Sequence, residues 1–259
     1  MLAIETSGLT RLFAGSPAVQ DLALSVPAGA FYGFLGPNGA GKSTTMRMLT
    51  GLLAPTSGSA RVLGIELARD PLAVKSLIGV VPDGLSLFER LTGAEQLRIH
   101  GQLYGLPRRE AARRSGELLE ALDLVAEGSK LVQEYSHGMK KKLALGCALI
   151  HGPRLLFLDE PFEGIDAVAV SGIRSMLQDL VSRGAMTVFL TSHVLEVVER
   201  LATHVGIIHR GRLVAQGTLA AVCAAGKLEE TFIRAVSDQR PAPRPLSWLG
   251  DGPGGAEEA

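Results

Sequence analysis

Short apolar segments alternate with helical patterns in the first part of the chain. Residues 18–26 place apolar side chains at alternate positions, which predicts a strand, and Pro27-Ala-Gly29 predicts a turn after it. An apolar run at 30–35 ends at a cluster of glycines, as a buried strand does. Residues 42–50 then follow a helical period, and Gly51 is placed to end that helix.

The second half of the chain repeats this alternation. Its pattern predicts strands at 155–158, 185–190, 205–208 and 213–215, with helices at about 166–182 and 194–201. Alternation of strands and helices is typical of a parallel sheet that is covered by helices. We therefore expect an α/β fold with a mostly parallel sheet.

The stretch between these two parts, residues 92–150, is almost entirely helical in pattern. Pro107 suits a helix start, and Leu118, Leu119, Leu122 and Val125 recur on one face. We expect a helical subdomain at about 84–150, inserted in a domain of residues 1–236. Residues 237–259 are rich in proline and glycine, which favours a disordered tail.

Composition narrows the possible classes of protein. The chain has 259 residues, and Lys+Arg 26 balance Asp+Glu 26, which argues against a nucleic-acid binder with a general basic field. Cys147 and Cys223 lack metal-ligand spacing, so a disulfide scaffold and a zinc module are not expected and a reducing cytoplasm fits. We expect no secretory signal, because residues 1–5 show no basic region followed by an apolar run. We expect no membrane span, because no run of eighteen apolar residues occurs.

The segment 36–43 matches the phosphate-binding pattern G-x-x-x-x-G-K-[ST]. It follows an apolar strand and opens a helix, which is the context that this loop requires. Its glycines let successive N–H groups turn toward phosphates, and the helix N-terminus favours anions. We expect Lys42 to reach the β- and γ-phosphates and the Ser43 hydroxyl to bind magnesium. The expected nucleotide-binding residues are Gly36, Pro37, Asn38, Gly39, Ala40, Gly41, Lys42, Ser43 and Thr44.

Two adjacent carboxylates, Asp159 and Glu160, follow the apolar strand at 155–158. Asp159 can hold the magnesium shell, while Glu160 points differently and can polarise a water for in-line attack on the γ-phosphate. An apolar run that ends in Asp-Glu also occurs where a strand simply leaves the core. Downstream of a phosphate loop, the catalytic interpretation is favoured.

Four further motifs resemble those of the ATP-binding subunits of ABC transporters. Tyr135-Ser136-His137-Gly138-Met139-Lys140 is similar to the signature of that family and lies before Asp159, where the family places it. Glu163-Gly-Ile-Asp166 resembles the D-loop, and His193 resembles the switch histidine. Phe13 falls where the family puts an aromatic ring under the adenine. The resemblance covers about residues 2–220.

The resemblance implies a P-loop ABC ATPase core, with an N-terminal antiparallel β part and an inserted helical subdomain. It implies hydrolysis of ATP with Mg²⁺, with Glu160, His193 and Lys42 as catalytic residues and with Ser43 and Asp159 at the metal. The signature residues Ser136, His137, Gly138 and Met139 would serve the ATP of an opposite subunit, because a hydroxyl and a helix N-terminus there can face an anion.

Two motifs depart from the usual pattern of the family. Asp83 stands where a Q-loop glutamine is usual; its carboxylate can ligate magnesium but is one methylene shorter. Asp83-Gly84 is also a turn dipeptide, so a turn with no metal role is the alternative. His137 and Met139 replace a glycine and a glutamine. These variants, together with residues 228–233, resemble subunits of ABC-2-type exporters.

The sequence therefore predicts a subunit that dimerises on MgATP, as a homodimer, and powers a separately encoded permease at the cytoplasmic face of the membrane. The permease is expected to be an exporter, and no nucleic-acid partner is expected. One alternative is a soluble ABC-type ATPase that acts on nucleic acid or ribosomes, but the chain has neither a basic surplus nor a second ATP-binding domain. The other is a small-molecule kinase, which leaves the signature and His193 unexplained.

Three consecutive lysines, Lys140, Lys141 and Lys142, follow the signature. Consecutive residues of a helix point in different directions, so a continuous phosphate-binding patch is not expected. The pattern predicts a solvated face with at most one functional lysine.

Overall fold

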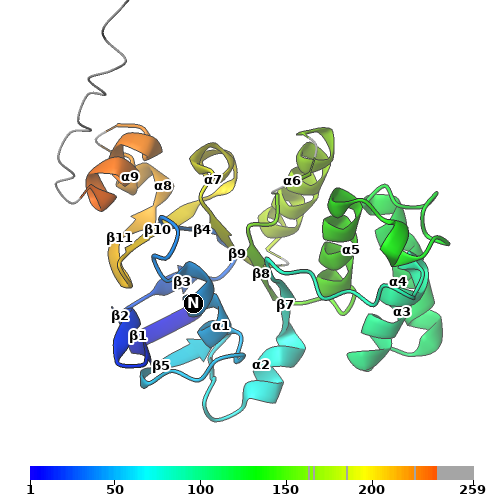
Figure 1. Ribbon diagram of the computed structural model, residues 1–259, viewed down its shortest axis with the longest axis horizontal. Coiled ribbons are helices and arrows are strands. Elements are labelled where there is room, and N and C mark those ends of the chain that lie inside the picture. Colours follow the sequence, from blue (N-terminus) through cyan, green and yellow to red (C-terminus); the bar gives the residue numbers. More distant parts are fainter. Residues whose placement is uncertain (163, 166, 185, 225, 238–259) are drawn as a thin grey trace, which may run out of the picture.

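The computed structural model (Figure 1) describes residues 1–162, 164–165, 167–184, 186–224 and 226–237. Its strands form two sheets, one antiparallel and one mostly parallel. The expected tail at 237–259 lies, apart from Ser237, outside the described residues.

The antiparallel sheet comes from the N-terminal part of the chain. Its order is β2-β1-β5-β6, and β3 also pairs with β1. The strands are β1 (Leu2–Phe13), β2 (Ser16–Leu22), β3 (Ser25–Pro27), β5 (Ser57–Val62) and β6 (Ile65–Glu66). The single strand predicted at 18–26 is therefore wrong: two strands form, and Ala23 and Leu24 between them belong to neither. Leu22 and Leu24 are both buried, so alternate residues stay buried through the break.

The second sheet has six strands in the order β11-β10-β4-β9-β8-β7. All neighbours from β10 to β7 are parallel, and β11 joins β10 as an antiparallel hairpin. The strands are β4 (Phe31–Leu35), β7 (Ile78–Val81), β8 (Leu155–Asp159), β9 (Thr187–Ser192), β10 (His204–His209) and β11 (Arg212–Thr218). The expected α/β fold with a mostly parallel sheet is confirmed.

Alternate residues of the parallel strands enter two separate apolar cores. In β4, Phe31 and Leu35 belong to one core, while Tyr32 and Phe34 belong to the other. The second core also holds the buried side of α1 (Lys42–Leu49) and Val74 of α2 (Pro71–Leu77). The first core takes buried residues from α5 (His137–Leu149), α6 (Ala167–Ser182) and α7 (Leu195–Leu201). The parallel sheet is thus covered on both faces, as its apolar strands require.

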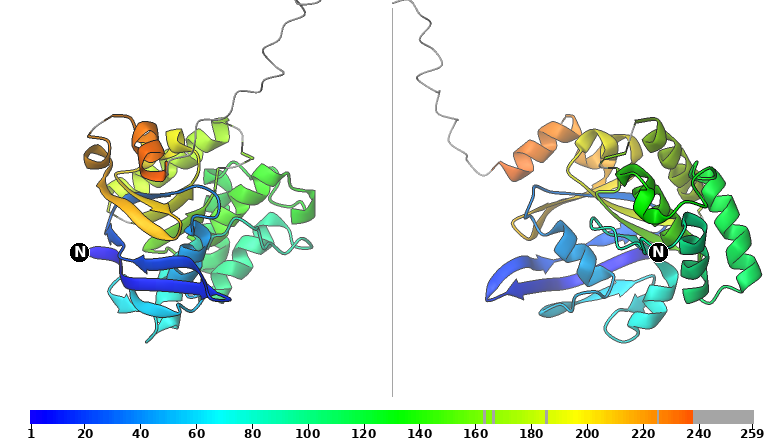
Figure 2. Two further views of the ribbon diagram at one scale, coloured as in Figure 1. Left: turned by 60° about the vertical axis from the view of Figure 1, so that its left-hand side comes forward. Right: turned by 45° about the vertical axis from the view of Figure 1, so that its right-hand side comes forward.

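The helices α3 (Gly93–Leu103), α4 (Arg108–Ala121) and α5, with the short η1 (Val132–Glu134), form the expected helical group. Figures 1 and 2 show α3, α4 and α5 together at the end of the molecule away from β1 and β2. One expectation in this stretch is wrong. Val125 is 63% exposed, because α4 ends at Ala121 and Asp123 (φ +52°) turns the chain, so that Leu124 is buried in its place.

Two short helices complete the described fold: α8 (Leu219–Val222) and α9 (Leu228–Val236). In Figure 1 they lie beside β10 and β11, above the antiparallel sheet. Within the described ranges, no helix has both the length and the apolar character that a membrane crossing needs.

Candidate functional site

Four neighbouring strands of the parallel sheet end at the same edge, and each is followed by residues that the sequence singled out. The glycine-rich loop follows β4, His193 follows β9, Glu160 follows β8, and Asp83 comes shortly after β7. The carboxyl ends of parallel strands are where α/β sheets bind their ligands. The topology therefore gathers the predicted motifs, which are far apart in the sequence, at one edge.

The glycine-rich loop connects β4 to α1 through two glycines in left-handed conformations. Gly39 has φ +76° and Gly41, the residue before α1, has φ +107°. Gly41 also lies so close to β2 that an added Cβ would be 2.6 Å from the Ala18 carbonyl oxygen. Glycine is therefore required at position 41 by both backbone conformation and space. The first turn of α1 carries no acidic residue, which leaves its N-terminus available to an anion.

Lys42 is held inside this loop. Its side chain is only 7% exposed, and Nζ donates to the carbonyl oxygens of Gly36 at 2.7 Å and Pro37 at 3.3 Å. Burial lowers the pKa of Lys42, while the nearby carboxylates of Glu160 and Asp159 act in the opposite direction. An anionic ligand such as a triphosphate would stabilise the charged form of Lys42, and so would offset the effect of burial.

The loop borders a cavity of about 300 Å³. Most of the phosphate loop, both carboxylates and Asp83 line it, while Gly36, Pro37, Phe13, His193 and the signature residues do not. The lining residues are Ala18, Asn38, Gly39, Ala40, Gly41, Lys42, Ser43, Thr44, Asp83, Asp159 and Glu160. Asp83 thus lies with the phosphate loop, as the metal interpretation requires. Asp83 is exposed, and the backbone bends at Asp83-Gly84, so both the metal role and the turn alternative stay predictions.

Asp159, the last residue of β8, is 7% exposed and is oriented by a residue of the next strand. The Thr191 hydroxyl of β9, itself fully buried, donates to Oδ1 of Asp159. This hydrogen bond follows from the register of the sheet, which places Asp159 opposite Thr191. It fixes one carboxylate oxygen and leaves the other for a ligand.

Glu160 lies just beyond the strand in a left-handed conformation, with φ +46°. Its carboxylate meets His193 twice: Oε1 is 3.0 Å from the ring nitrogen Nδ1, and Oε2 accepts from the backbone N–H at 3.3 Å. A non-glycine residue at positive φ is unusual, and such strain is found at functional sites. The two expected catalytic residues, Glu160 and His193, are therefore in direct contact.

The donor set at this edge fits a magnesium ion that also binds phosphates. Ser43 offers a hydroxyl and Asp159 and Asp83 offer carboxylates, all of them around one cavity. In the described part of the chain, no group of three or more His, Cys, Asp or Glu side chains forms a cage for a metal. Mg²⁺ uses one or two protein ligands and completes its shell with phosphates and water, so this sparse set is suitable.

The signature residues stand apart from this cavity, at the start of α5. Ser136 caps the helix, and its Oγ accepts from the Met139 N–H at 3.2 Å. His137 and Gly138 pack against Gly164: a Cβ on Gly164 would be 2.8 Å from His137 Cδ2. None of the four signature residues lines the cavity of the phosphate loop. Asp166, the expected D-loop residue, lies outside the described residues.

Phe13 also lies away from the phosphate loop. It ends β1, is 46% exposed, and is not among the residues that line the cavity. The guanidinium carbon of Arg11 lies 4.7 Å from its ring centre, so a cation already occupies one face of the ring. Its place under an adenine ring stays a prediction.

Two residues of the site are missed by sequence reasoning. Thr191 orients Asp159, and Lys141 of α5 donates to the Glu160 carbonyl oxygen at 2.9 Å. Lys141 is 4% exposed, so this one lysine of the three does not lie on a solvated face. The expectation of at most one functional lysine stays a prediction. The Thr191 contact could be predicted only with knowledge of the register between β8 and β9. The Lys141 contact could be predicted only with knowledge of where α5 packs.

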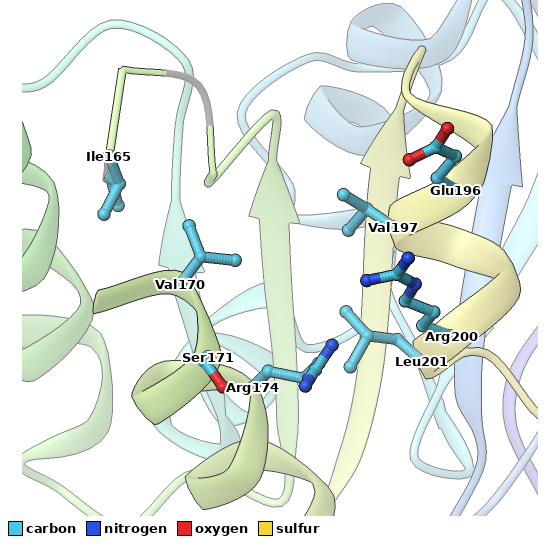
Figure 3. Close-up of a pocket in the computed structure, with 8 residues that line it drawn as sticks. All are labelled: Ile165, Val170, Ser171, Arg174, Glu196, Val197, Arg200 and Leu201. Carbon is cyan, nitrogen blue, oxygen red and sulfur yellow. The ribbon is translucent and has the colours of Figure 1, made fainter. Parts of the chain in front are cut away.

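A larger cavity, of about 410 Å³, lies between α6 and α7 (Figure 3). Arg174 of α6 and Arg200 of α7 extend toward it from opposite sides, and apolar residues such as Val170 and Leu201 complete its wall. It contains neither the glycine loop nor the paired carboxylates. Chemistry rather than size therefore identifies the candidate site.

Comparison with known proteins gives the same assignment. The profile of the ABC transporter family matches residues 19–163, more than half of the chain. The bacitracin transport ATP-binding protein BcrA of Bacillus licheniformis is 39% identical over 210 residues, which are 81% of this chain and 68% of BcrA. The chain belongs to the ABC transporter family. It is an ATP-binding subunit of that family, with the fold of an ABC ATPase.

Other relatives and solved structures agree with this membership. The daunorubicin/doxorubicin resistance ATP-binding protein DrrA of Streptomyces peucetius is 42% identical over 216 residues, which span 83% of this chain but only 65% of DrrA. A solved ATP-binding subunit of an ABC transporter superimposes with a TM-score of 0.84 at 30% identity, covering 91% of this chain and 99% of its own. A dimeric bacterial ABC transporter cassette shares the fold, with a TM-score of 0.78 at 22% identity over 83% of this chain and 98% of its own.

Membership in the ABC family explains the signature and the switch histidine together. A small-molecule kinase would leave both unexplained. This subunit is an ABC transporter ATPase, which energises transport.

Proposed function

We propose that this ABC subunit binds MgATP in the cavity of the phosphate loop and hydrolyses it with Glu160 as the general base. The supporting observation is the position of Glu160, which lines that cavity with Lys42 and Asp159 while its carboxylate contacts His193. A carboxylate so placed can accept a proton from a water that attacks the γ-phosphate in line. The products are ADP and phosphate.

Each neighbouring group has a distinct task in this reaction. Lys42, with N–H groups of residues 38–44, would bind the β- and γ-phosphates and spread their negative charge. Ser43, Asp159 and Asp83 would hold magnesium, which neutralises phosphate charge when it is bound. His193 would hold Glu160 through its ring and its N–H, and the ring would also face the γ-phosphate.

We infer that the complete site needs a second subunit. Ser136, His137, Gly138 and Met139 are absent from the lining of the cavity, yet their helix N-terminus offers a hydroxyl and N–H groups to an anion. Two copies that pair head to tail would bring each signature to the γ-phosphate of the other copy. A D-loop role for Asp166 belongs to the same arrangement. Closure of the dimer on ATP, and its opening after hydrolysis, would drive transport.

The partner that receives this motion is proposed to be a separately encoded permease, with the subunit at the cytoplasmic face of the membrane. The names of DrrA and BcrA associate those proteins with daunorubicin/doxorubicin resistance and with bacitracin transport. The signature variant with His137 and Met139 resembles ABC-2-type exporters. On both grounds we assign this subunit to an exporter of that group.

Dimerisation of the full chain tests the composite site. In the variant Glu160→Gln, ATP should bind but turn over slowly, so that size-exclusion chromatography with MgATP shows a stable dimer. The same variant with ADP should elute as a monomer. A monomer in both nucleotides would contradict the proposal.

A further inference from the structure

The three consecutive lysines of α5 have three different environments. Lys140 pairs with Glu89 at 3.3 Å and Lys142 with Asp123 at 3.9 Å, both of them carboxylates with exposed side chains. Lys141 points inward instead, and its Nζ donates to the backbone carbonyl oxygen of Glu160 at 2.9 Å. Only Lys141 of the three therefore reaches the proposed catalytic residue.

The surroundings of Lys141 are apolar. Lys141 is 4% exposed as a residue, and it lines a small enclosed space with Val81, Leu145, Leu158, Phe162 and other apolar residues. A charged amine in such a place loses its hydration. Among the described residues its hydrogen-bond partner is one neutral carbonyl oxygen, which compensates only in part. A leucine or methionine would fill the same space without that loss. Packing alone therefore does not account for a lysine here.

The Lys141 hydrogen bond acts on a strained part of the backbone. Glu160 has φ +46°. Its backbone N–H donates to the carbonyl oxygen of Thr191 at 3.2 Å, which holds the end of the residue nearer to β8. On the other side, the carbonyl group of Glu160 is held by Lys141. The two bonds come from different elements, β9 and α5, and together restrict the backbone from which the Glu160 carboxylate extends.

We propose that Lys141 is a positioning residue for ATP hydrolysis. Its amine holds the Glu160 backbone in the left-handed conformation that aims the carboxylate at the attacking water. Lys141 follows Ser136 by five residues on the same helix, so the bond also ties the signature end of α5 to Glu160. The inference rests on the proposed role of Glu160 as the general base.

The test uses the full chain and the variant Lys141→Met, which keeps the aliphatic stem and removes the donor. We expect kcat to fall by at least ~10-fold, because small displacements of a catalytic group have effects of this size or larger. The affinity for ATP should stay within about twofold, since Lys141 does not line the nucleotide cavity. Lys141→Arg keeps donors at this position and should recover most of the loss. Lys142→Met, in the same run of lysines, is the matched control and should turn over normally.

A double variant separates positioning from a general loss of structure. If Lys141 acts through Glu160, then adding Lys141→Met to Glu160→Gln should slow single-turnover hydrolysis by less than about twofold. Effects that multiply in the double variant would overturn the proposal. Thermal unfolding should show no loss of stability in Lys141→Met or Lys141→Leu, because an apolar side chain suits the space. Failure of both variants to fold would also overturn it, since the lysine would then hold the fold rather than the reaction.

The outcome distinguishes this inference from the proposed function. Wild-type turnover in Glu160→Gln would refute the general-base role itself. Slow turnover in Glu160→Gln with normal kcat in Lys141→Met would refute only the positioning role.

Discussion

The two left-handed glycines of the phosphate loop give a quantitative test of how tightly the loop is packed. Gly39 and Gly41 both have positive φ, at +76° and +107°. A Cβ at Gly39 meets no atom within 4 Å, whereas a Cβ at Gly41 would be 2.6 Å from Ala18 O and 3.2 Å from Val19 Cγ2. The substitutions Gly39→Ala and Gly41→Ala therefore differ mainly in crowding.

The expected magnitudes follow from these contacts. An alanine at positive φ costs about 1–2 kcal/mol, and the lower entropy of its unfolded chain offsets roughly 0.4–1 kcal/mol of that. Gly39→Ala should therefore destabilise the fold by about 1 kcal/mol. Gly41→Ala adds the displacement of backbone in β2, and overpacking of this kind costs about 1–3 kcal/mol. Its total should be about 2–4 kcal/mol.

Urea unfolding without nucleotide measures both free energies, and thermal unfolding gives a second reading. For a chain of this size, 1 kcal/mol corresponds to about 2–4 °C in Tm, so Gly41→Ala should unfold about 5–15 °C below wild type. Gly39→Ala should stay within about 4 °C. Equal losses in the two variants, or a larger loss in Gly39→Ala, would refute the contact between the loop and β2.

Three further predictions concern the proposed composite site. Ser136→Arg should leave ATP affinity of the single chain nearly intact but abolish dimerisation and turnover, and a mixture with Lys42→Ala should recover at most one active site per dimer; full activity of Ser136→Arg alone would contradict this. Burial lowers the pKa of Lys42, while bound phosphates favour its charged form. The affinity for ATP should therefore be constant below the Lys42 pKa and weaken above it by up to ~10-fold per pH unit. This decline should begin at a lower pH than it would with a lysine of ordinary pKa. Arginine stays protonated, so the ATP affinity of Lys42→Arg, measured by titration calorimetry, should not decline over the same pH range. Asp83→Gln should be tolerated with a less steep magnesium dependence of ATPase rate, and Asp83→Ala should lose stimulation by the permease; superimposable magnesium titrations with intact stimulation would leave only a turn role.

Local motifs predict most of the residues that line the cavity of the phosphate loop. The phosphate loop and the carboxylates Asp159 and Glu160 are contiguous patterns directly after apolar strands, and parallel strands bring such ends to one edge. The elements that the pattern does not predict are mostly short or polar. β5, for example, buries only Ala60 and Val62, since its other residues face solvent, and so it lacks a clear alternating signal.

Contacts that depend on the placement of whole elements could not be predicted. Thr191 reaches Asp159 through the register between β8 and β9, and Lys141 reaches Glu160 because α5 packs beside the end of β8. Val125 is misplaced for a different reason. The helical period of the sequence continues past Asp123, but the chain turns at that residue and buries Leu124 instead. Periodicity describes an element only as far as its backbone conformation continues.

The rate of ATP hydrolysis by Glu160→Gln is the most direct test of Glu160 as the general base. Glutamine keeps the size of the side chain and can keep contact with His193, but it cannot take a proton from water. With MgATP binding measured in parallel, we expect unchanged affinity and a rate at least ~100-fold below wild type, the usual size of general-base effects. Hydrolysis at the wild-type rate would contradict the assignment of Glu160.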